Sequence, residues 1–225
     1  IYHTKIQRKG VSIVTIDLET RQVTAPLTLE RTAQNDDEPE HTVITGYALK
    51  YNKPSEILGG FCRFIEEIEP GALDSADMSN VVATINHDQS QVLGRSGVNL
   101  TLEPDDIGLK FTVEPTDTSF ARDLVANINA GVINQCSFAF TVAPDDDAED
   151  WQESTRDGVD YDRTIRKIDH LYDVSVVTTP AYPDTEAVVG QRSINRVREQ
   201  SHIAIDKERR KLLLQYEKEE LLNSL

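Results

Sequence analysis

A serine stands on what reads as the open face of a β-strand in the segment INQCSFAF, residues 133–140. Side chains alternate between the two faces of a strand, so Cys136, Phe138 and Phe140 are expected to share one face. Ser137 falls on the opposite face, where its neighbours are small. Such a serine is either a small filler beneath another layer or a hydroxyl kept accessible for nucleophilic chemistry.

Two further residues have the types that a serine nucleophile requires. His87 ends a strand-like run in the segment TINHDQS, between polar residues. Asp173 interrupts the apolar run HLYDVSVVTT, and a buried carboxylate is costly unless a donor pairs with it. That donor could be a cluster of backbone amides, an arginine, or the Nδ1–H of a histidine, as in a serine–histidine–acid triad. Spacing alone does not establish that the three residues meet.

The elements that must position these residues are mainly strands. Short β-branched or alternating runs recur between turn sequences such as EPDDIG and NKPSE. They predict strands over residues 11–18, 23–30, 42–51, 62–69, 80–87, 97–103, 108–114, 133–140, 161–169 and 170–182. The last of these runs is nearly all apolar, which predicts a central strand.

Three segments depart from the strand pattern. Residues 118–131 are predicted to form an amphipathic helix, because apolar side chains recur every four positions and a glycine ends the run. Residues 143–160 are strongly acidic, which favours a flexible loop. Residues 203–224 are charged and leucine-rich, which predicts a helix that self-associates or docks on a partner surface.

The composition excludes several classes of protein. The chain has 225 residues and a formal net charge of −16, which argues against binding to nucleic acid or to anionic lipid. No apolar run approaches the length of a membrane span, and the first residues lack the apolar core of a signal peptide. The two cysteines, Cys62 and Cys136, lie far apart and indicate neither a zinc site nor a disulfide framework, so a reducing intracellular setting is expected.

Four segments occur in order between about residues 46 and 185: GYALKYNKPSEILGGFCRFIEEIEPGAL, NHDQSQVLGRS, DIGLKFTVEPTDTSFARDLVANINAGVINQCSFAF and RTIRKIDHLYDVSVVTTPAYPDT. Together they resemble the prohead maturation proteases of tailed bacteriophages, serine peptidases related to the herpesvirus assemblins. The resemblance implies a mainly β chain with flanking helices (α+β), folded as a closed or nearly closed antiparallel β-barrel with a C-terminal helix. It implies N-terminal strands and an extension over 1–41, a catalytic domain over 42–190, and a linker and helix over 191–225.

The resemblance also implies roles for individual residues. Family members carry a base in the NHD strand and a nucleophile in an SFGF-like strand, which correspond here to His87 and Ser137. Asp173 stands where the family usually has an acid in its L-x-E-V-S strand, and His170 is the alternative third member, by analogy with the second histidine of the herpesvirus enzymes. Arg95 in VLGRS resembles the assemblin arginine that holds an oxyanion-stabilising water, and a salt-bridged hairpin arginine explains it equally well.

Cys136 is the other nucleophile to consider. It stands where the family commonly has methionine or a similar apolar residue, and strand alternation places it among the phenylalanines. A thiolate nucleophile needs an accessible, electropositive setting, so we do not expect Cys136 to react.

The resemblance predicts a serine endopeptidase that acts without a cofactor inside the assembling prohead, in the host cytoplasm. The expected substrates are the major capsid protein and the scaffold, with self-cleavage as a further option, and the expected state is a homo-oligomer. The alternative is a catalytically inactive β-barrel protein of capsid assembly or scaffolding. A metal-dependent hydrolase is set aside, because the sequence has neither H-E-x-x-H nor a clustered His/Asp motif.

Overall fold

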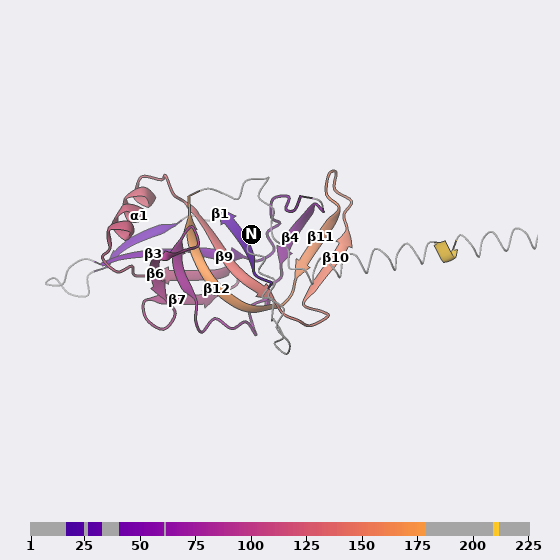
Figure 1. Cartoon of the computed structure of the whole chain (residues 1–225), viewed down its shortest axis with the longest axis horizontal. Coiled ribbons are helices and arrows are strands. Elements are labelled where there is room, and N and C mark those ends of the chain that lie inside the picture. Colours follow the sequence, from indigo (N-terminus) through magenta and orange to yellow (C-terminus); the bar gives the residue numbers. More distant parts are fainter. Residues whose placement is uncertain (1–16, 25–26, 33–40, 61, 179–208, 212–225) are drawn as a thin grey trace, which may run out of the picture.

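The structure is a computed structural model that describes residues 17–24, 27–32, 41–60, 62–178 and 209–211. In these residues twelve strands form three sheets, and α1 is the helix described in full (Figure 1). The prediction of a mainly β chain is confirmed. No helix in this described part has the length and apolarity of a membrane span.

The largest sheet carries the candidate residues. Its strands lie in the order β1-β9-β12-β5-β6. Their bounds are Glu19–Thr24 for β1, Gln135–Val142 for β9, Ile168–Val177 for β12, Val82–Ile85 for β5 and Asp88–Arg95 for β6. β12 pairs antiparallel with β9 and parallel with β5, so the central position predicted from its apolar sequence is confirmed.

A four-stranded sheet shares its hydrophobic core with the first sheet. Its strands lie in the order β2-β3-β8-β7. Their bounds are Thr28–Thr32 for β2, His41–Lys50 for β3, Gly108–Val113 for β8 and Leu100–Pro104 for β7. Ile44 and Phe111 from this sheet and Phe138 from β9 are all buried in the common core.

The third sheet is small and lies to the right of the main body in Figure 1. Its strands, in the order β10-β11-β4, are Glu149–Glu153, Tyr161–Ile165 and Phe64–Ile68. Phe64 and Trp151 form a second apolar cluster there, with ring centroids 5.0 Å apart.

The predicted closed antiparallel barrel is wrong for the described residues. The strands form three separate sheets, and the pairs β12–β5 and β11–β4 are parallel. Alternation along a strand shows which face is apolar but not which strand lies beside it. The small sheet has its own aromatic cluster. It can therefore form a separate sheet without pairing with a strand of the two larger sheets. Of the predicted C-terminal helix, residues 209–211 are helical and the remainder lies outside the described residues.

The predicted helix over 118–131 is confirmed as α1, Ser119–Asn129. The side chain of Thr118 caps its first turn by accepting from the Ala121 amide at 3.3 Å. Leu124 and Ile128 are buried against the core.

The flexible loop predicted over 143–160 is wrong in its central part, which forms β10. Trp151 is 6 % exposed and packs on Phe64, and Glu149 is buried in an ion-pair network. The prediction weighed only the acidic composition of the segment. The packing of Trp151 and the ion pair of Glu149 together order the strand.

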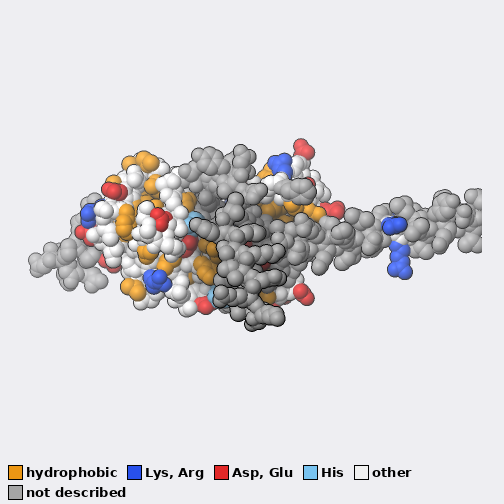
Figure 2. Space-filling view, in the orientation of Figure 1, with side chains coloured by type: hydrophobic (Ala, Val, Ile, Leu, Met, Phe, Trp, Pro, Cys, Tyr) orange, Lys and Arg blue, Asp and Glu red, His pale blue; other side chains and the backbone are white. Residues whose placement is uncertain are grey.

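The N-terminal strands belong to the same sheets as the rest of the chain. β1 pairs with β9 and β2 pairs with β3, although both lie in the segment 1–41 that we separated from the catalytic domain. On the face drawn in Figure 2, the described Lys and Arg side chains are scattered and form no continuous basic patch.

Candidate active site

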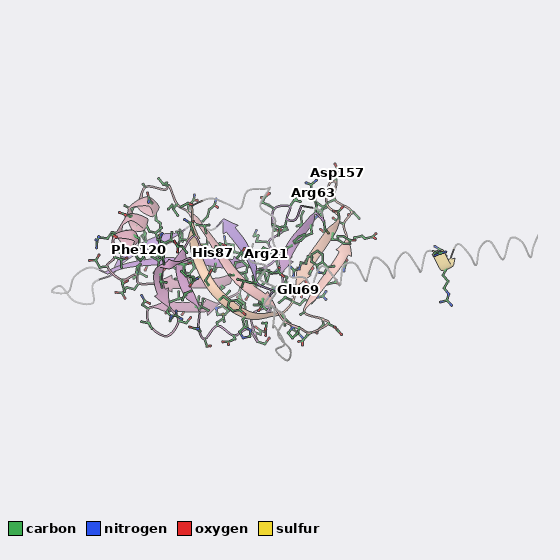
Figure 3. All side chains as sticks on the ribbon, in the orientation of Figure 1. Arg21, Arg63, Glu69, His87, Phe120 and Asp157 are labelled. Atoms are coloured by element: carbon green, nitrogen blue, oxygen red, sulfur yellow. The ribbon has the colours of Figure 1, made fainter. Side chains whose placement is uncertain are left out.

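Ser137, His87 and Asp173 meet on one face of the five-stranded sheet. His87 Nε2 lies 2.6 Å from Ser137 Oγ, and His87 Nδ1 lies 2.7 Å from Asp173 Oδ1. Figure 3 shows His87 and Arg21 near the middle of the molecule. The three side chains therefore form a continuous hydrogen-bonded chain drawn from three different strands or strand ends.

Strand register aligns the serine with the aspartate. On β12, Asp173 pairs with Ala139 of β9 and Ser175 pairs with Ser137, so these side chains share a face. Phe138 lies on the opposite face, as the alternation predicts, and its ring stacks on the next aromatic residue of β9 with centroids 5.0 Å apart. The face of Ser137 is nevertheless covered, because the residue is 0 % exposed.

His87 occupies a tight turn between β5 and β6. Ile85 pairs with Asp88 across a two-residue loop, and both loop residues have positive φ, 53° at Asn86 and 58° at His87. These angles are those of a type I′ hairpin turn, which most often has glycine at its second position. The Asn86 side chain also fixes the loop to the end of β12, since its Oδ1 accepts from the Thr178 amide at 3.0 Å. The turn points the imidazole back over the sheet.

Ser175 is a site residue that the sequence analysis missed. Its Oγ accepts from the His87 amide at 2.8 Å and lies 3.1 Å from both the hydroxyl and the carbonyl oxygen of Thr84. Because it donates one proton to that carbonyl and accepts twice, its hydrogen-bonding capacity is used. Alternation from Asp173 along β12 places Ser175 on the same face, which is the signal that could have revealed it. We infer that Ser175 is a positioning residue for His87.

Replacing Ser175 by alanine is expected to lower kcat for the reaction at Ser137 roughly tenfold to a hundredfold with little change in KM, because the imidazole loses its alignment. Steady-state kinetics would measure this effect. Thr101→Ala, at an exposed position on β7, is the matched control and should change neither constant. An unchanged kcat in Ser175→Ala would contradict the positioning role.

The structure does not bring Arg95 or His170 to the serine. Arg95 is exposed on β6, which β5 and β12 separate from β9 by roughly 14 Å, and its guanidinium donates to Asn80. His170 is half-exposed, with its Nδ1 2.8 Å from the Asp169 carboxylate. Asp173, not His170, is therefore the residue that contacts His87.

Cys136 is buried on the aromatic side of β9, 0 % exposed, as strand alternation predicts. Burial raises the pKa of its thiol to about 12, so the thiol stays protonated at neutral pH.

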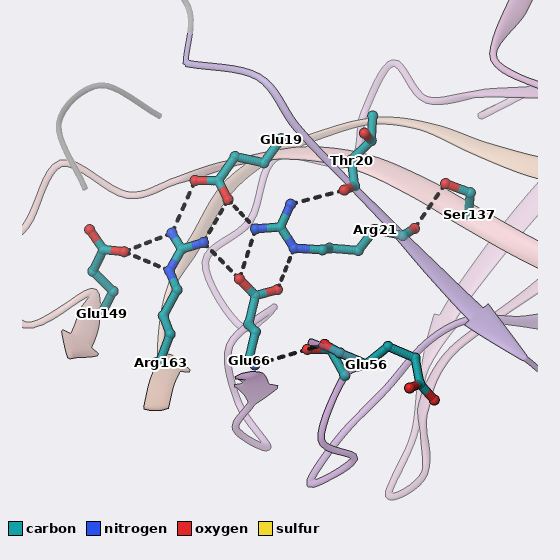
Figure 4. Close-up of polar contacts among 9 residues, drawn as sticks. Glu19, Thr20, Arg21, Glu56, Glu66, Ser137, Glu149 and Arg163 are labelled. Carbon is teal, nitrogen blue, oxygen red and sulfur yellow. Dashed lines mark hydrogen bonds and ion pairs between the residues drawn. The ribbon is translucent and has the colours of Figure 1, made fainter. Parts of the chain in front are cut away.

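A network of five buried charges lies beside the site and joins β1 to the small sheet (Figure 4). Arg21 Nε and Nη2 donate to the two oxygens of Glu66 at 2.7 and 2.8 Å. Arg163 donates to Glu19 at 2.6 and 3.0 Å, and also to Glu66 and Glu149, both at 2.7 Å. The network holds β1, β4, β10 and β11 together.

The network makes Glu19 sensitive to acid. Burial alone would raise the pKa of the Glu19 carboxyl, but the charges and hydrogen bonds of Arg163 and Arg21 outweigh burial and lower it from 4.5 to about 2. A depressed carboxyl pKa stabilises the fold above pH 4.5, and that contribution is lost as the pH falls toward 2.

We therefore expect Glu19 to contribute about 3 kcal/mol to the free energy of unfolding near neutral pH, and to lose that contribution between pH 4.5 and about 2. Urea unfolding at a series of pH values would measure it. Glu19→Gln should flatten the acid limb of the stability curve, and parallel curves for the two proteins would contradict the expectation.

A serine, a histidine and an aspartate linked in this order are the arrangement of the serine hydrolases. The described residues contain no group of three His, Cys, Asp or Glu side chains placed to hold a metal ion. The chain matches the family described as Caudovirus prohead serine protease over residues 28–200, and it belongs to that family.

Among solved structures, the capsid assembly protease of bacteriophage T4, gp21, is similar with a TM-score of 0.48 and 13 % identity. The similarity covers 72 % of this chain and 98 % of the T4 chain. No curated protein matches the sequence.

Proposed function

We propose that the chain is a serine endopeptidase in which Ser137 is the nucleophile, His87 the general base and Asp173 the residue that orients the base. The observation that supports this most directly is the hydrogen-bonded chain of 2.6 and 2.7 Å contacts through His87. Membership in a family of prohead serine proteases also supports the proposed peptidase activity.

The geometry supports the following sequence of steps. Ser137 Oγ attacks a peptide carbonyl while His87 Nε2 takes its proton, and Asp173 stabilises the imidazolium through Nδ1–H. His87 then gives the proton to the departing amine. Water, deprotonated by the same histidine, releases the acyl group from Ser137.

The substrates we propose are the capsid and scaffold proteins of the prohead, cut inside the assembling particle in the host cell. Self-cleavage is part of the same proposal. Self-association through residues 203–224 stays a prediction, because only residues 209–211 of that segment are described.

Co-expression with the major capsid protein of the same phage tests this function. We expect the wild-type chain to shorten the capsid protein, measured by intact mass, and Ser137→Ala to leave it full length. Ser90→Ala, at an exposed serine on β6, is the matched control and should behave as wild type. An inactive assembly protein would instead leave the capsid protein full length with every variant.

A further inference from the structure

The hydroxyl of Ser137 is covered by a strand of the chain itself. β1 pairs with β9 so that Gln22 lies opposite Ser137, and β12 occupies the other edge of β9. Ser137 Oγ lies 2.9 Å from the carbonyl oxygen of Arg21 (Figure 4). Extended peptides bind most readily along a strand edge, and the edge of β9 next to the nucleophile is the one that β1 fills.

The contact with Arg21 also engages the proton that the reaction needs. A serine hydroxyl has one proton to donate. When that proton goes to the Arg21 carbonyl, Ser137 Oγ can only accept from His87 Nε2–H, and because Nδ1–H still faces Asp173 the ring is then an imidazolium. His87 cannot then act as a base toward Ser137. β1 therefore both covers the nucleophile and diverts its proton.

Two side chains of β1 pair with buried charges in the neighbouring sheet. Arg21 makes a bidentate contact with Glu66 of β4, and Glu19 accepts two hydrogen bonds from Arg163 of β11. Glu19 and Arg21 are two positions apart and thus project from the same face of the strand. A strand that replaces β1 meets Glu66 and Arg163 at the same spacing.

Burial makes Glu66 and Arg163 selective for charged partners. Glu66 and Arg163 are 3 % and 1 % exposed, and a buried charge that loses its partner is strongly destabilising. A strand with apolar side chains at the two positions would remove one of the two arginines that bond Glu66 and one of the three carboxylates that bond Arg163. The planar guanidinium matches the two oxygens of Glu66 in a way that lysine cannot.

We propose that β1 is an internal occupant of the substrate-binding edge of β9, and that Glu66 and Arg163 select an arginine and a glutamate two residues apart in the strand that displaces it. This inference rests on the proposed peptidase function and names its substrate class, an extended Glu-x-Arg segment. In the described residues the extended form of this motif is Glu19 to Arg21 of β1.

The first test measures displacement of β1 without relying on catalysis. In the full-length Ser137→Ala chain, a saturating peptide containing ETRQVT should raise hydrogen exchange of the backbone amides of residues 19–24 roughly tenfold or more. A matched peptide containing QTLQVT should leave that exchange unchanged. Equal exchange with the two peptides, whether raised or not, would overturn the selection by Glu66 and Arg163.

The second test measures access to Ser137. With a small fluorophosphonate, Arg21→Ala should label Ser137 roughly tenfold faster than wild type, because the open state is more populated. Thr20→Ala changes an exposed neighbour on β1 and should label at the wild-type rate. Equal rates for Arg21→Ala and wild type, with Arg21→Ala folded, would overturn the covering role of β1.

The outcomes separate this inference from the proposed function. If no variant labels at position 137, the nucleophile assignment fails, while the exchange measurement still reports whether the peptide displaces β1. If Arg21→Ala does not fold, that exchange measurement decides the inference alone.

Discussion

Ser137→Ala is expected to lower kcat for a peptide substrate by roughly 10⁴- to 10⁶-fold, which is the size of effect that follows from removing a serine nucleophile. The change deletes one oxygen from a fully buried residue, so no large cavity forms and the sheet should remain intact. Steady-state kinetics, together with the urea midpoint, would measure both effects.

Ser90→Ala is again the matched control, since Ser90 is exposed and its amide and hydroxyl bond to the nearby Asp88. Peptidase activity in Ser137→Ala at more than about one thousandth of the wild-type rate would show that another residue supplies the nucleophile.

Asp173→Asn is expected to lower kcat by about 10⁴-fold, at the lower end of the loss expected for Ser137→Ala. An asparagine amide cannot stabilise the imidazolium of His87, and it can favour the wrong tautomer of the ring. Activity should therefore persist at a low, measurable level. The kcat values of both variants would be measured under conditions in which chemistry limits the rate.

Asp169→Asn provides the matched control on the same strand, because the Asp169 carboxylate contacts His170 whereas that of Asp173 contacts His87. If Asp169→Asn lowered kcat as much as Asp173→Asn does, the third member of the triad would instead be His170 with its partner Asp169.

The residues of the candidate triad were predicted from the sequence in two steps: local patterns singled out Ser137 and Asp173, and the resemblance to the prohead proteases supplied their roles and that of His87. Asp173 is a carboxylate in an apolar strand, and Ser137 is a small polar residue opposite a row of aromatic rings. Local patterns also predicted α1 and most of the strands. Sequence spacing does not show that Asp173 and Ser137 meet. The strand register in the structure does, because it places them on neighbouring strands with their side chains on the same face.

The covering strand and the charge network could not be predicted in this way. Arg21 and Ser137 are 116 positions apart, and no pattern within a window of ten residues encodes such a pairing. Glu149 lies in the acidic segment that was predicted as a flexible loop, and no sequence pattern singled out Arg163. Their burial depends on partners that only the folded chain brings together, and the same limit explains why the predicted barrel was wrong.

At position 87 the residue that the turn favours for stability, glycine, differs from the histidine that the proposed chemistry requires. A non-glycine residue with φ of 58° holds a backbone conformation that costs of order 1 kcal/mol or more, which glycine would avoid. Sequence drift toward a more stable hairpin would therefore favour Asn-Gly at positions 86 and 87 and remove the imidazole. A relative that is no longer catalytic should therefore be recognisable by glycine at the position of His87, and this change should appear before changes in the hydrophobic core.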